Sequence, residues 1–248
     1  MGKVTLKIQN HQAWLSINRP EKRNAIDYEV IELLNEQLDI IGENNEVKVL
    51  VVTGVGEQAF CSGGDLSVFH SIHTKQEAKE MLVKMAEVLH KLFFFPKPTI
   101  AFLNGSAVGG GCEIATACDF RIAEKNVKLG FIQGKLGITT GWGGSTYLVE
   151  RVSNQDAFWM LLSAEIFDAK EGLNRGFIQN MFTREEFDYW LMTYTKQPLG
   201  VIKAYKQRIL AQYNQNVMLE RVLAEIEDCS TLWETPEHHE AVQQFLQK

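Results

Sequence analysis

Two glycine-rich segments have the residue types needed to bring backbone amides against a ligand. Residues 60–66 read Phe-Cys-Ser-Gly-Gly-Asp-Leu, and residues 104–113 read Asn-Gly-Ser-Ala-Val-Gly-Gly-Gly-Cys-Glu. Glycine lets an amide approach a ligand without an intervening Cβ, and the first turn of a helix directs unpaired N–H groups at negative charge. For either segment alone, a tight turn or close packing is the more common role. Together, two such turns can direct N–H groups at one oxygen.

The chain before these segments predicts a hairpin and a helix. Lys3–Ile8 and Ala13–Ile17 read as two strands joined by a turn over residues 9–12. Apolar residues at helical spacing then predict a helix over Asp27–Ile41, with Asp27 as its N-cap.

Continuous apolar runs predict strands that are buried on both faces. Val47–Thr53 is one such run, Thr99–Leu103 follows the prolines that end a helix predicted over Glu77–Phe94, and a third strand is expected around Phe120–Ala123. Strands separated by helices imply βαβ units, and hence an α/β fold with a mainly parallel sheet and right-handed crossovers. Ligands in such folds bind at the carboxyl ends of strands, where each glycine-rich segment would end a strand and open a helix.

From Asn154 onward the pattern becomes largely helical. The stretch Val201–Cys229 is long and amphipathic, and its apolar stripe could pack on the core or on another subunit. Packing within the chain is favoured, because such stripes usually face a core. The helices expected in this region cover residues 155–162, 169–175, 184–194, 200–227 and 237–246.

Composition limits the classes of function. The 248 residues suffice for one large α/β domain, and 45% hydrophobic with 23% charged residues is ordinary globular usage. A formal charge of -6 argues against broad non-specific binding to nucleic acid or anionic membrane. The four cysteines lack zinc-site spacing, and no signal-peptide pattern is visible, so reduced thiols and a cytoplasmic location are expected.

Taken in order, the motifs resemble the enoyl-CoA hydratase/isomerase, or crotonase, superfamily. The set begins with Asn-Arg-Pro-Glu-Lys-Arg-Asn-Ala at residues 18–25 and continues through both glycine-rich segments. It then includes Leu-Gly pairs at 129–130 and 136–137, Trp-Gly-Gly at 142–144, and residues 167–173. The ordered set covers nearly the whole chain and is far more specific than any single motif. It implies the ClpP/crotonase-like fold, with repeated ββα units and a C-terminal helical region.

The resemblance implies an oxyanion hole formed by the backbone amides of Gly64 and Gly110. These N–H groups would hold the thioester carbonyl as it gains enolate character. Removing one such preorganised donor typically costs about 3 kcal/mol in well-studied enzymes.

The resemblance also implies that coenzyme A enters as part of a thioester substrate, with no prosthetic group and no metal. The loop of residues 18–25 and the turn of residues 63–66 would cradle it. Lys22 and Arg23 are candidates for its phosphates, although a solvated surface position is as common for such side chains. The expected contacts are Lys22, Arg23, Ala25, Ser62, Gly63, Asp65 and Leu66.

One of the two acid–base positions of the family carries an amide here. Family hydratases use two glutamates, and the first corresponds to Glu113. Counting between the Leu-Gly pairs places Gln133 at the second position. A glutamine can orient a water but cannot transfer a proton at neutral pH, which puts two-carboxylate hydration in doubt. In isolation, Glu113 would be read as a carboxylate that favours the first turn of a helix by about 0.3–1 kcal/mol.

Three activities are compatible with these residues. Enoyl-CoA hydratase/isomerase-type chemistry is the first expectation, and isomerisation suits a single glutamate better than hydration. The turn 63–66 and residues 141–145 resemble the ethylmalonyl-CoA decarboxylase branch, so a malonyl-type (ethylmalonyl or methylmalonyl) acyl-CoA decarboxylase is the leading alternative. Glu113 would repel a substrate carboxylate unless it were protonated, which burial could favour. The third is a non-catalytic acyl-CoA-binding subunit.

The resemblance also suggests how the chain is divided and assembled. Residues 1–195 are expected to form the core with the acyl-CoA site, and residues 196–248 a helical region that covers the site and contributes to oligomerisation. Family members commonly form trimers or pairs of trimers, so a homotrimer or hexamer is expected. Trp142 is expected either to wall the acyl pocket or to cover the sheet as a core aromatic. His70 and His73 are expected at the surface without a catalytic role.

Overall fold

The N-terminal hairpin and helix lie where the sequence predicts them in the computed structural model, which describes residues 2–247. Strands β1 (Val4–Gln9) and β2 (Gln12–Ile17) are antiparallel and are joined by a two-residue turn. Asp27 caps α1 (Tyr28–Glu43), because its carboxylate accepts a hydrogen bond from the Val30 N–H at 3.0 Å. A short 3-10 helix, η1 (Pro20–Lys22), lies between the hairpin and α1.

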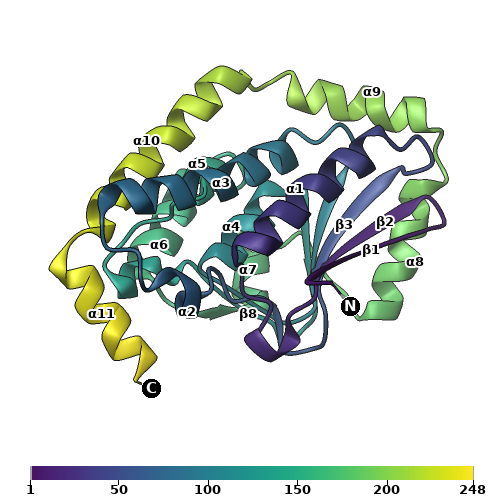
Figure 1. The fold of residues 1–248 in the computed structure, drawn as a ribbon. Coiled ribbons are helices and arrows are strands. Elements are labelled where there is room, and N and C mark those ends of the chain that lie inside the picture. The colour runs from purple at the N-terminus through teal and green to yellow at the C-terminus, as the bar shows by residue number, and fades with distance from the viewer. Residues whose placement is uncertain (1, 248) are drawn as a thin grey trace.

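A six-stranded sheet forms the centre of the molecule and confirms the expected α/β class (Figure 1). Its order is β1-β2-β3-β5-β7-β10, and every neighbouring pair after the hairpin is parallel. The strands added to the hairpin are β3 (Val49–Gly54), β5 (Thr99–Leu103), β7 (Phe120–Ala123) and β10 (Asn180–Met181).

Helices cover both faces of this sheet, which explains the continuous apolar runs. Leu50 and Val52 belong to the main core, in which α1 and α3 (Lys75–Phe93) take part. Val49 and Val51 face the other way, into a smaller cluster with Phe187 of α8 (Arg184–Thr195). Alternate residues of β3 are therefore buried under different helices.

A second, four-stranded sheet was not expected from the sequence. It has the order β4-β6-β8-β9, with β4 (Ala59–Cys61), β6 (Ser106–Val108), β8 (Lys128–Gly130) and β9 (Phe167–Asp168). Strands of two or three residues are too short to show an alternating pattern, which is why they were missed. The glycine turns therefore follow short strands of this second sheet, β4 and β6, and not the long strands of the central sheet.

Short helices follow the strands of the second sheet and place the loops of the site. Helix α2 (Leu66–Phe69) follows β4, and α4 (Gly110–Ala117) follows β6. The elements between β8 and the C-terminal region are η2 (Ile132–Leu136), α5 (Gly144–Leu148), α6 (Asn154–Ser163) and α7 (Ala169–Asn174).

The C-terminal region corrects the prediction of one helix over residues 200–227. The chain instead forms two helices there, α9 (Leu199–Leu210) and α10 (Gln215–Trp233), whereas α11 (Pro236–Leu246) matches the helix expected over residues 237–246. Asn214 ends the continuity, because its side chain accepts from the Asn216 and Val217 N–H groups and so starts a new helix. In Figure 1, α9 and α10 form an arc over the core, and α11 turns back from its end.

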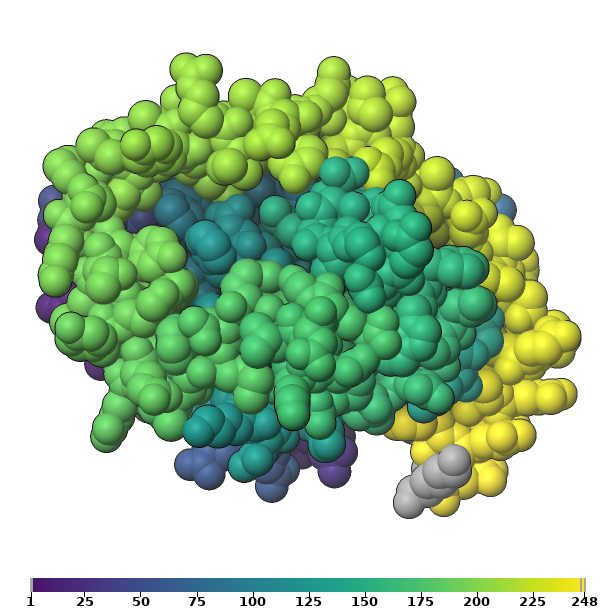
Figure 2. Space-filling view, turned by 180° about the vertical axis from the view of Figure 1, so that it is seen from behind, coloured from purple at the N-terminus to yellow at the C-terminus, as the bar shows by residue number. Residues whose placement is uncertain are grey.

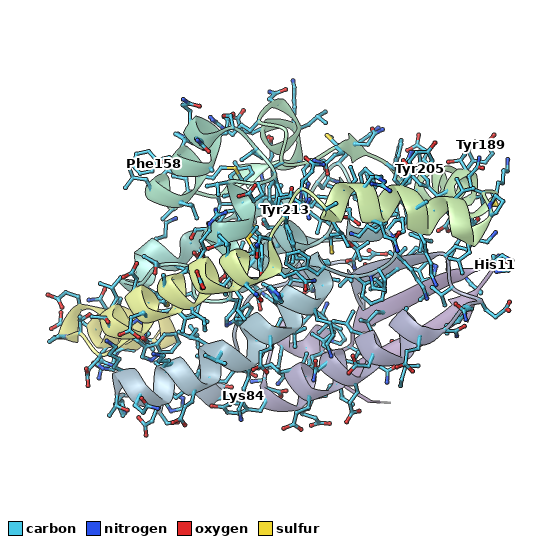
Figure 3. The ribbon with its side chains drawn as sticks, turned by 90° about the horizontal axis from the view of Figure 1, so that it is seen from above. His11, Lys84, Phe158, Tyr189, Tyr205 and Tyr213 are labelled. Atoms are coloured by element: carbon cyan, nitrogen blue, oxygen red, sulfur yellow. The ribbon has the colours of Figure 1, made fainter. Side chains whose placement is uncertain are left out.

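The apolar stripe of this region divides between the core and the surface. Helix α10 packs against α3 and α5, as favoured from the sequence. Helix α9 differs, because Val201, Tyr205 and Ile209 are exposed. Figure 2 shows a hollow beneath the arc on the back of the molecule, and Tyr189 and Tyr205 project outward on that side in Figure 3.

No helix between residues 2 and 247 combines the length and apolar character that crossing a bilayer requires.

Candidate active site

The two glycine turns meet because the strands that precede them are neighbours. Strands β4 and β6 pair in parallel, so their carboxyl ends lie at the same edge of the second sheet. Gly63 has a φ of +94° and Gly109 a φ of +54°, which favour glycine at both turns. A Cβ added to Gly63 would lie 3.1 Å from the Gly110 amide nitrogen. The turns are therefore in direct contact.

Each turn contains a glycine amide without a hydrogen-bond partner among the described residues. Ile26 pairs with the first turn by donating to the Gly63 carbonyl and accepting from the Asp65 N–H. Gly110 is the first residue of α4, where N–H groups have no intrahelical acceptor. Among residues 2–247, neither the Gly64 nor the Gly110 N–H donates to another group of the chain. These are the amides that the sequence resemblance assigns to an oxyanion hole.

Glu113 lies one turn into α4 and is 3% exposed. Its Oε2 accepts from the Trp142 N–H at 2.8 Å and from the Gly144 N–H at 3.0 Å. Its Oε1 accepts from Nε2 of Gln133 at 2.8 Å. The carboxylate is thus held in one orientation by three donors from two other segments.

The pKa of Glu113 is raised from 4.5 to about 7, first by burial and second by the charge of Glu225. The three donors oppose this shift, because they favour the ionised form. Glu225 lies on α10 and accepts from the N–H and hydroxyl groups of both Ser145 and Thr146. Near neutral pH, Glu113 therefore exists in both protonation states.

Gln133 lies on η2 beside Glu113, 8% exposed. The structure thus brings together the two residues, Glu113 and Gln133, that the family resemblance places at the two acid–base positions. The side-chain oxygen of Gln133 is buried without a hydrogen-bond partner among the described residues. A buried unpaired acceptor is uncommon and marks a place where a ligand or water donor fits.

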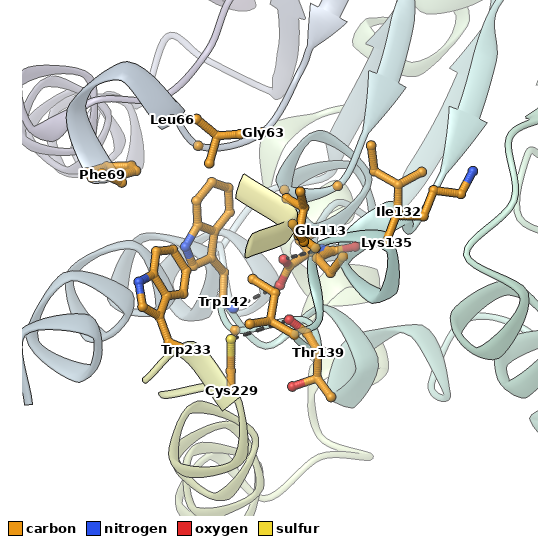
Figure 4. Close-up of a pocket in the computed structure, with 18 of the residues that line it drawn as sticks. Gly63, Leu66, Phe69, Glu113, Ile132, Lys135, Thr139, Trp142, Cys229 and Trp233 are labelled. Atoms are coloured by element: carbon orange, nitrogen blue, oxygen red, sulfur yellow. Dashed lines mark hydrogen bonds between the residues drawn. The ribbon is translucent and has the colours of Figure 1, made fainter. Parts of the chain in front are cut away.

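Trp142 forms a wall of the site. A Cβ added to Gly110 would overlap its ring, and one added to Gly64 would lie 3.7 Å from it. The indole thus lies against both glycines that carry the unpaired amides, and it is 5% exposed. In Figure 4, Trp142 and Trp233 lie on the same side of Glu113.

A cavity of about 410 Å³ connects these groups. Its size is in the range of small-molecule sites, and most of its lining is apolar. Glu113 is the single carboxylate in the lining formed by the described residues. Apolar side chains from α3, η2, α10 and α11 complete the walls, among them Met81, Leu82, Ile132, Leu136, Trp233 and Phe245.

An adjoining groove contains every residue expected to contact coenzyme A except Gly63, which lines the cavity. Ser62, Gly64 and Leu66 line both spaces, so the groove continues into the cavity. Lys22 and Arg23 are exposed at the groove and form no ion pair within the described chain. The expected contacts gathered here are Lys22, Arg23, Ala25, Ser62, Asp65 and Leu66.

The carboxylate of Asp65 has a structural task in this groove. It accepts from Arg19 at 2.8 Å, caps α2 through the Ser67 N–H and binds the Ser67 hydroxyl at 2.6 Å. Arg19 also donates to the Ala25 carbonyl, and Asn24 holds the same loop by donating to the Ala59 carbonyl. Its backbone is engaged as well, because its N–H donates to the Ile26 carbonyl and its carbonyl accepts from the Val68 and Phe69 N–H groups, so Asp65 holds the shape of the groove.

The sequence analysis did not identify several residues of the site, among them Arg19, Lys128, Glu225 and Phe245. Arg19 lies within the resembling motif, so its place in that motif was an available signal. Glu225, Lys128 and Phe245 come from distant segments, and no local pattern distinguishes them. Phe245 of α11 lines both the cavity and the groove.

Of the described histidines and cysteines, Cys229 lines the cavity, and burial raises the pKa of its thiol. His70 and His73 are exposed. All four cysteines are buried and free, and burial raises the pKa of Cys61, Cys112 and Cys118 to about 12. Within residues 2–247, no group of histidine, cysteine and acidic side chains is arranged to hold a metal ion.

Comparison with known proteins shows the family and the fold of the chain. A family model described as Enoyl-CoA hydratase/isomerase matches residues 7–248. Ethylmalonyl-CoA decarboxylase of Xenopus laevis is 31% identical over 239 residues, covering 94% of this chain and 79% of that protein. Crotonyl-CoA hydratase of Syntrophomonas wolfei is 31% identical over 221 residues, covering 89% of this chain and 80% of that protein. A crystal structure of enoyl-CoA hydratase from Bacillus halodurans shares the fold, with a TM-score of 0.90 at 24% identity over 98% of this chain and all (100%) of that one.

Proposed function

The chain belongs to the enoyl-CoA hydratase/isomerase, or crotonase, family of acyl-CoA enzymes, and from this membership we propose that it decarboxylates malonyl-type acyl-CoA thioesters such as ethylmalonyl-CoA. The observation that carries the proposal is the state of Glu113. It is the one carboxylate lining the described cavity, and its pKa is raised to about 7. A neutral acid at this position removes the repulsion that an anionic acyl group would otherwise meet.

The proposed reaction uses the unpaired amides and Glu113 in sequence. The thioester oxygen accepts from the Gly64 and Gly110 N–H groups. The bond between the α-carbon and the substrate carboxylate breaks, CO₂ leaves, and its electron pair forms an enolate that the two amides stabilise. Protonated Glu113 then delivers its proton to the α-carbon and is protonated again from solvent, so that one proton is consumed for each CO₂ released.

The surroundings of the α-carbon support this order of steps. Trp142 covers the glycines from one side and excludes water from the place where charge develops. A dry site strengthens each amide interaction with the enolate. Coenzyme A would lie in the groove beside Lys22 and Arg23, whose charges complement its phosphates.

Isomerisation of an enoyl-CoA double bond is the second candidate. It needs one group that removes and returns a proton, and an ionised Glu113 with a pKa near neutrality suits that task. Hydration is less well supported, because Gln133 stands where the second carboxylate of a hydratase is expected, and an amide does not transfer protons at neutral pH.

A three-substrate assay tests the proposal. The purified protein is incubated separately with ethylmalonyl-CoA, a 3-enoyl-CoA and crotonyl-CoA, and product masses are followed. We expect CO₂ loss from ethylmalonyl-CoA without hydration of crotonyl-CoA. Double-bond migration in the 3-enoyl-CoA without CO₂ loss would favour isomerisation, and binding of all three without turnover would favour a non-catalytic acyl-CoA-binding subunit.

The assembly proposed for this enzyme is a homotrimer or a pair of trimers. Exposed apolar side chains on α8 and α9 support a subunit contact on the back of the molecule, because patches of this kind mark interaction surfaces.

A further inference from the structure

We propose that Gln133 is a specificity-determining residue whose amide turns with the protonation state of Glu113, so that the cavity offers a hydrogen-bond donor to an anionic acyl group only when Glu113 is protonated. This inference rests on the proposed function, because it concerns how the same cavity selects a carboxylated thioester.

The first observation is the one-sided bonding of the amide. Nε2 of Gln133 donates to Oε1 of Glu113 at 2.8 Å, while the amide oxygen is buried without a partner. Gln133 lines the cavity, and a Cβ added to Gly109 would lie 4.0 Å from its amide carbon. The amide therefore borders the turn that carries the unpaired Gly110 N–H. An acyl group bound to that amide would pass beside Gln133.

The second observation is that the proton of Glu113 has one available position. Oε2 already accepts from the Trp142 and Gly144 N–H groups at 2.8 and 3.0 Å. A proton would therefore be carried by Oε1, directed at Gln133. Two donors cannot face each other, so the amide must turn by half a revolution and accept this hydrogen bond with its oxygen. Its NH₂ group then faces the cavity.

The two states give the cavity opposite preferences. With Glu113 ionised, the cavity offers a carboxylate and a carbonyl oxygen, both of which repel an anionic group. With Glu113 protonated, it offers a neutral acid and an amide NH₂ group, which donates to an anion. Protonation of Glu113 thus changes both charge and hydrogen-bonding polarity at one place.

Other titratable groups also lie near Glu113. Glu225 and Cys229 face it from α10, Tyr147 lies on α5, and Cys112 precedes it on α4. Burial raises the pKa of Cys229, Cys112 and Tyr147, which keeps them neutral. Glu225 is the remaining acidic group, and its four hydrogen bonds from Ser145 and Thr146 hold it at the N-terminus of α5.

A matched pair of non-reactive ligands tests the proposal. Butyryl-CoA is uncharged in its acyl group. The second ligand, 2-sulfobutyryl-CoA, carries a sulfonate on the α-carbon, which cannot leave as CO₂ and stays ionised at neutral pH. Dissociation constants are measured by calorimetry at about pH 6 and about pH 8.5, below and above the titration of Glu113. The readout is the preference for the sulfonate over butyryl-CoA, which cancels changes in coenzyme binding and in the folded fraction.

In the unaltered protein, the preference for the sulfonate over butyryl-CoA is expected to fall by about 10-fold or more from the lower to the higher pH. Gln133→Met keeps the side-chain volume but not the amide. In this variant the preference for the sulfonate is expected to be about 10-fold weaker than in the unaltered protein at the lower pH and little changed at the higher pH. Glu113→Gln is expected to retain the full preference at both, because its NH₂ group always donates to the Gln133 oxygen.

The proposal would be overturned if Gln133→Met weakened the preference for the sulfonate equally at both pH values. It would also be overturned if the preference in Glu113→Gln still fell as the pH rises. The assay of CO₂ release is independent of these measurements. Absence of CO₂ release with the expected binding pattern would refute the proposed function alone, and CO₂ release without that pattern would refute the role of Gln133 alone.

Discussion

At the scale of the residue, Glu113 is subject to opposing influences, of which those that raise its pKa are the larger. Burial and the charge of Glu225 favour the neutral acid, whereas the donors from Trp142, Gly144 and Gln133 favour the carboxylate. Because both protonation states are accessible near neutral pH, the same residue suits either proton donation or proton removal. The direction of the pH dependence therefore reports which reaction the enzyme performs.

We expect kcat/KM for CO₂ release to fall as the pH rises through about 7, the value to which the pKa of Glu113 is raised. The protonated form is populated below this value, and it both tolerates the anionic substrate and donates the proton. Isomerisation requires the ionised form, so its kcat/KM would rise over the same range. Initial rates from about pH 5.5 to about pH 9 separate the two, and a flat profile would remove Glu113 from the mechanism.

Gly110→Ala tests the position of the amide in α4. The added Cβ would overlap the Trp142 ring, so the helix start or the indole must move. We expect a loss of at least about 10²-fold in kcat, as for loss of one oxyanion donor. Gly200→Ala is the matched control, because nothing lies within 4 Å of its added Cβ. Similar losses in the two variants would contradict a specific role for the Gly110 amide.

At the scale of the element, the five-residue helix α5 connects Glu113 to the C-terminal region. Its N-terminal amides divide between two carboxylates, because Gly144 donates to Glu113 whereas Ser145 and Thr146 donate to Glu225. Carboxylates at a helix N-terminus are favoured by the helix dipole as well as by these bonds. Helix α10 thereby influences Glu113 without a contact between Glu225 and the cavity.

Glu225→Gln is expected to lower the midpoint of the pH profile by about half a unit or more, because removing a like charge favours ionised Glu113. Compared with the unaltered protein, the absolute rate of CO₂ release should consequently be reduced most near pH 7, and it should be reduced least in acid. Glu220→Gln, at an exposed position of the same helix, is the control. A lower rate with an unmoved midpoint would mean that Glu225 acts on stability alone.

At the scale of the whole molecule, the C-terminal helices have different surroundings. Helix α10 lies on α3 and α5, and α11 reaches the mouth of the cavity through Phe245. Helix α9 instead spans a hollow lined by Trp190, Tyr194 and Ile209 on the back of the molecule (Figure 2). Its outward side chains are the ones that a neighbouring subunit would cover.

Tyr205→Glu tests this surface. Tyr205 is 72% exposed, so its replacement should leave the fold of the single chain intact. A charge buried in a subunit contact is strongly unfavourable, so we expect the assembly to dissociate to monomers. Light scattering after size-exclusion chromatography measures the mass, with Lys84→Glu on the opposite side of the molecule as the control (Figure 3). An unchanged mass in both variants would exclude this surface.

Long elements were predictable because their physical causes are local. The apolar spacing of α1, the carboxylate of Asp27 as its cap and the continuous apolar run of β3 each act within one segment. The break at Asn214 and the strands of the second sheet were not predicted. A cap inside a helical pattern competes with helix propensity, and a strand of two or three residues exists only through its neighbours.

The sequence by itself determined the family and the fold, because an ordered set of motifs along the chain is a property of the chain alone. It also named Gly64, Gly110, Glu113 and Gln133 as candidates. Only the tertiary structure decided that the two glycine turns touch and that Gln133 donates to Glu113. It alone also places the charge of Glu225 so that the pKa of Glu113 is raised. Contact distance, burial and electrostatic coupling depend on segments far apart in sequence, and these quantities set the pKa of Glu113.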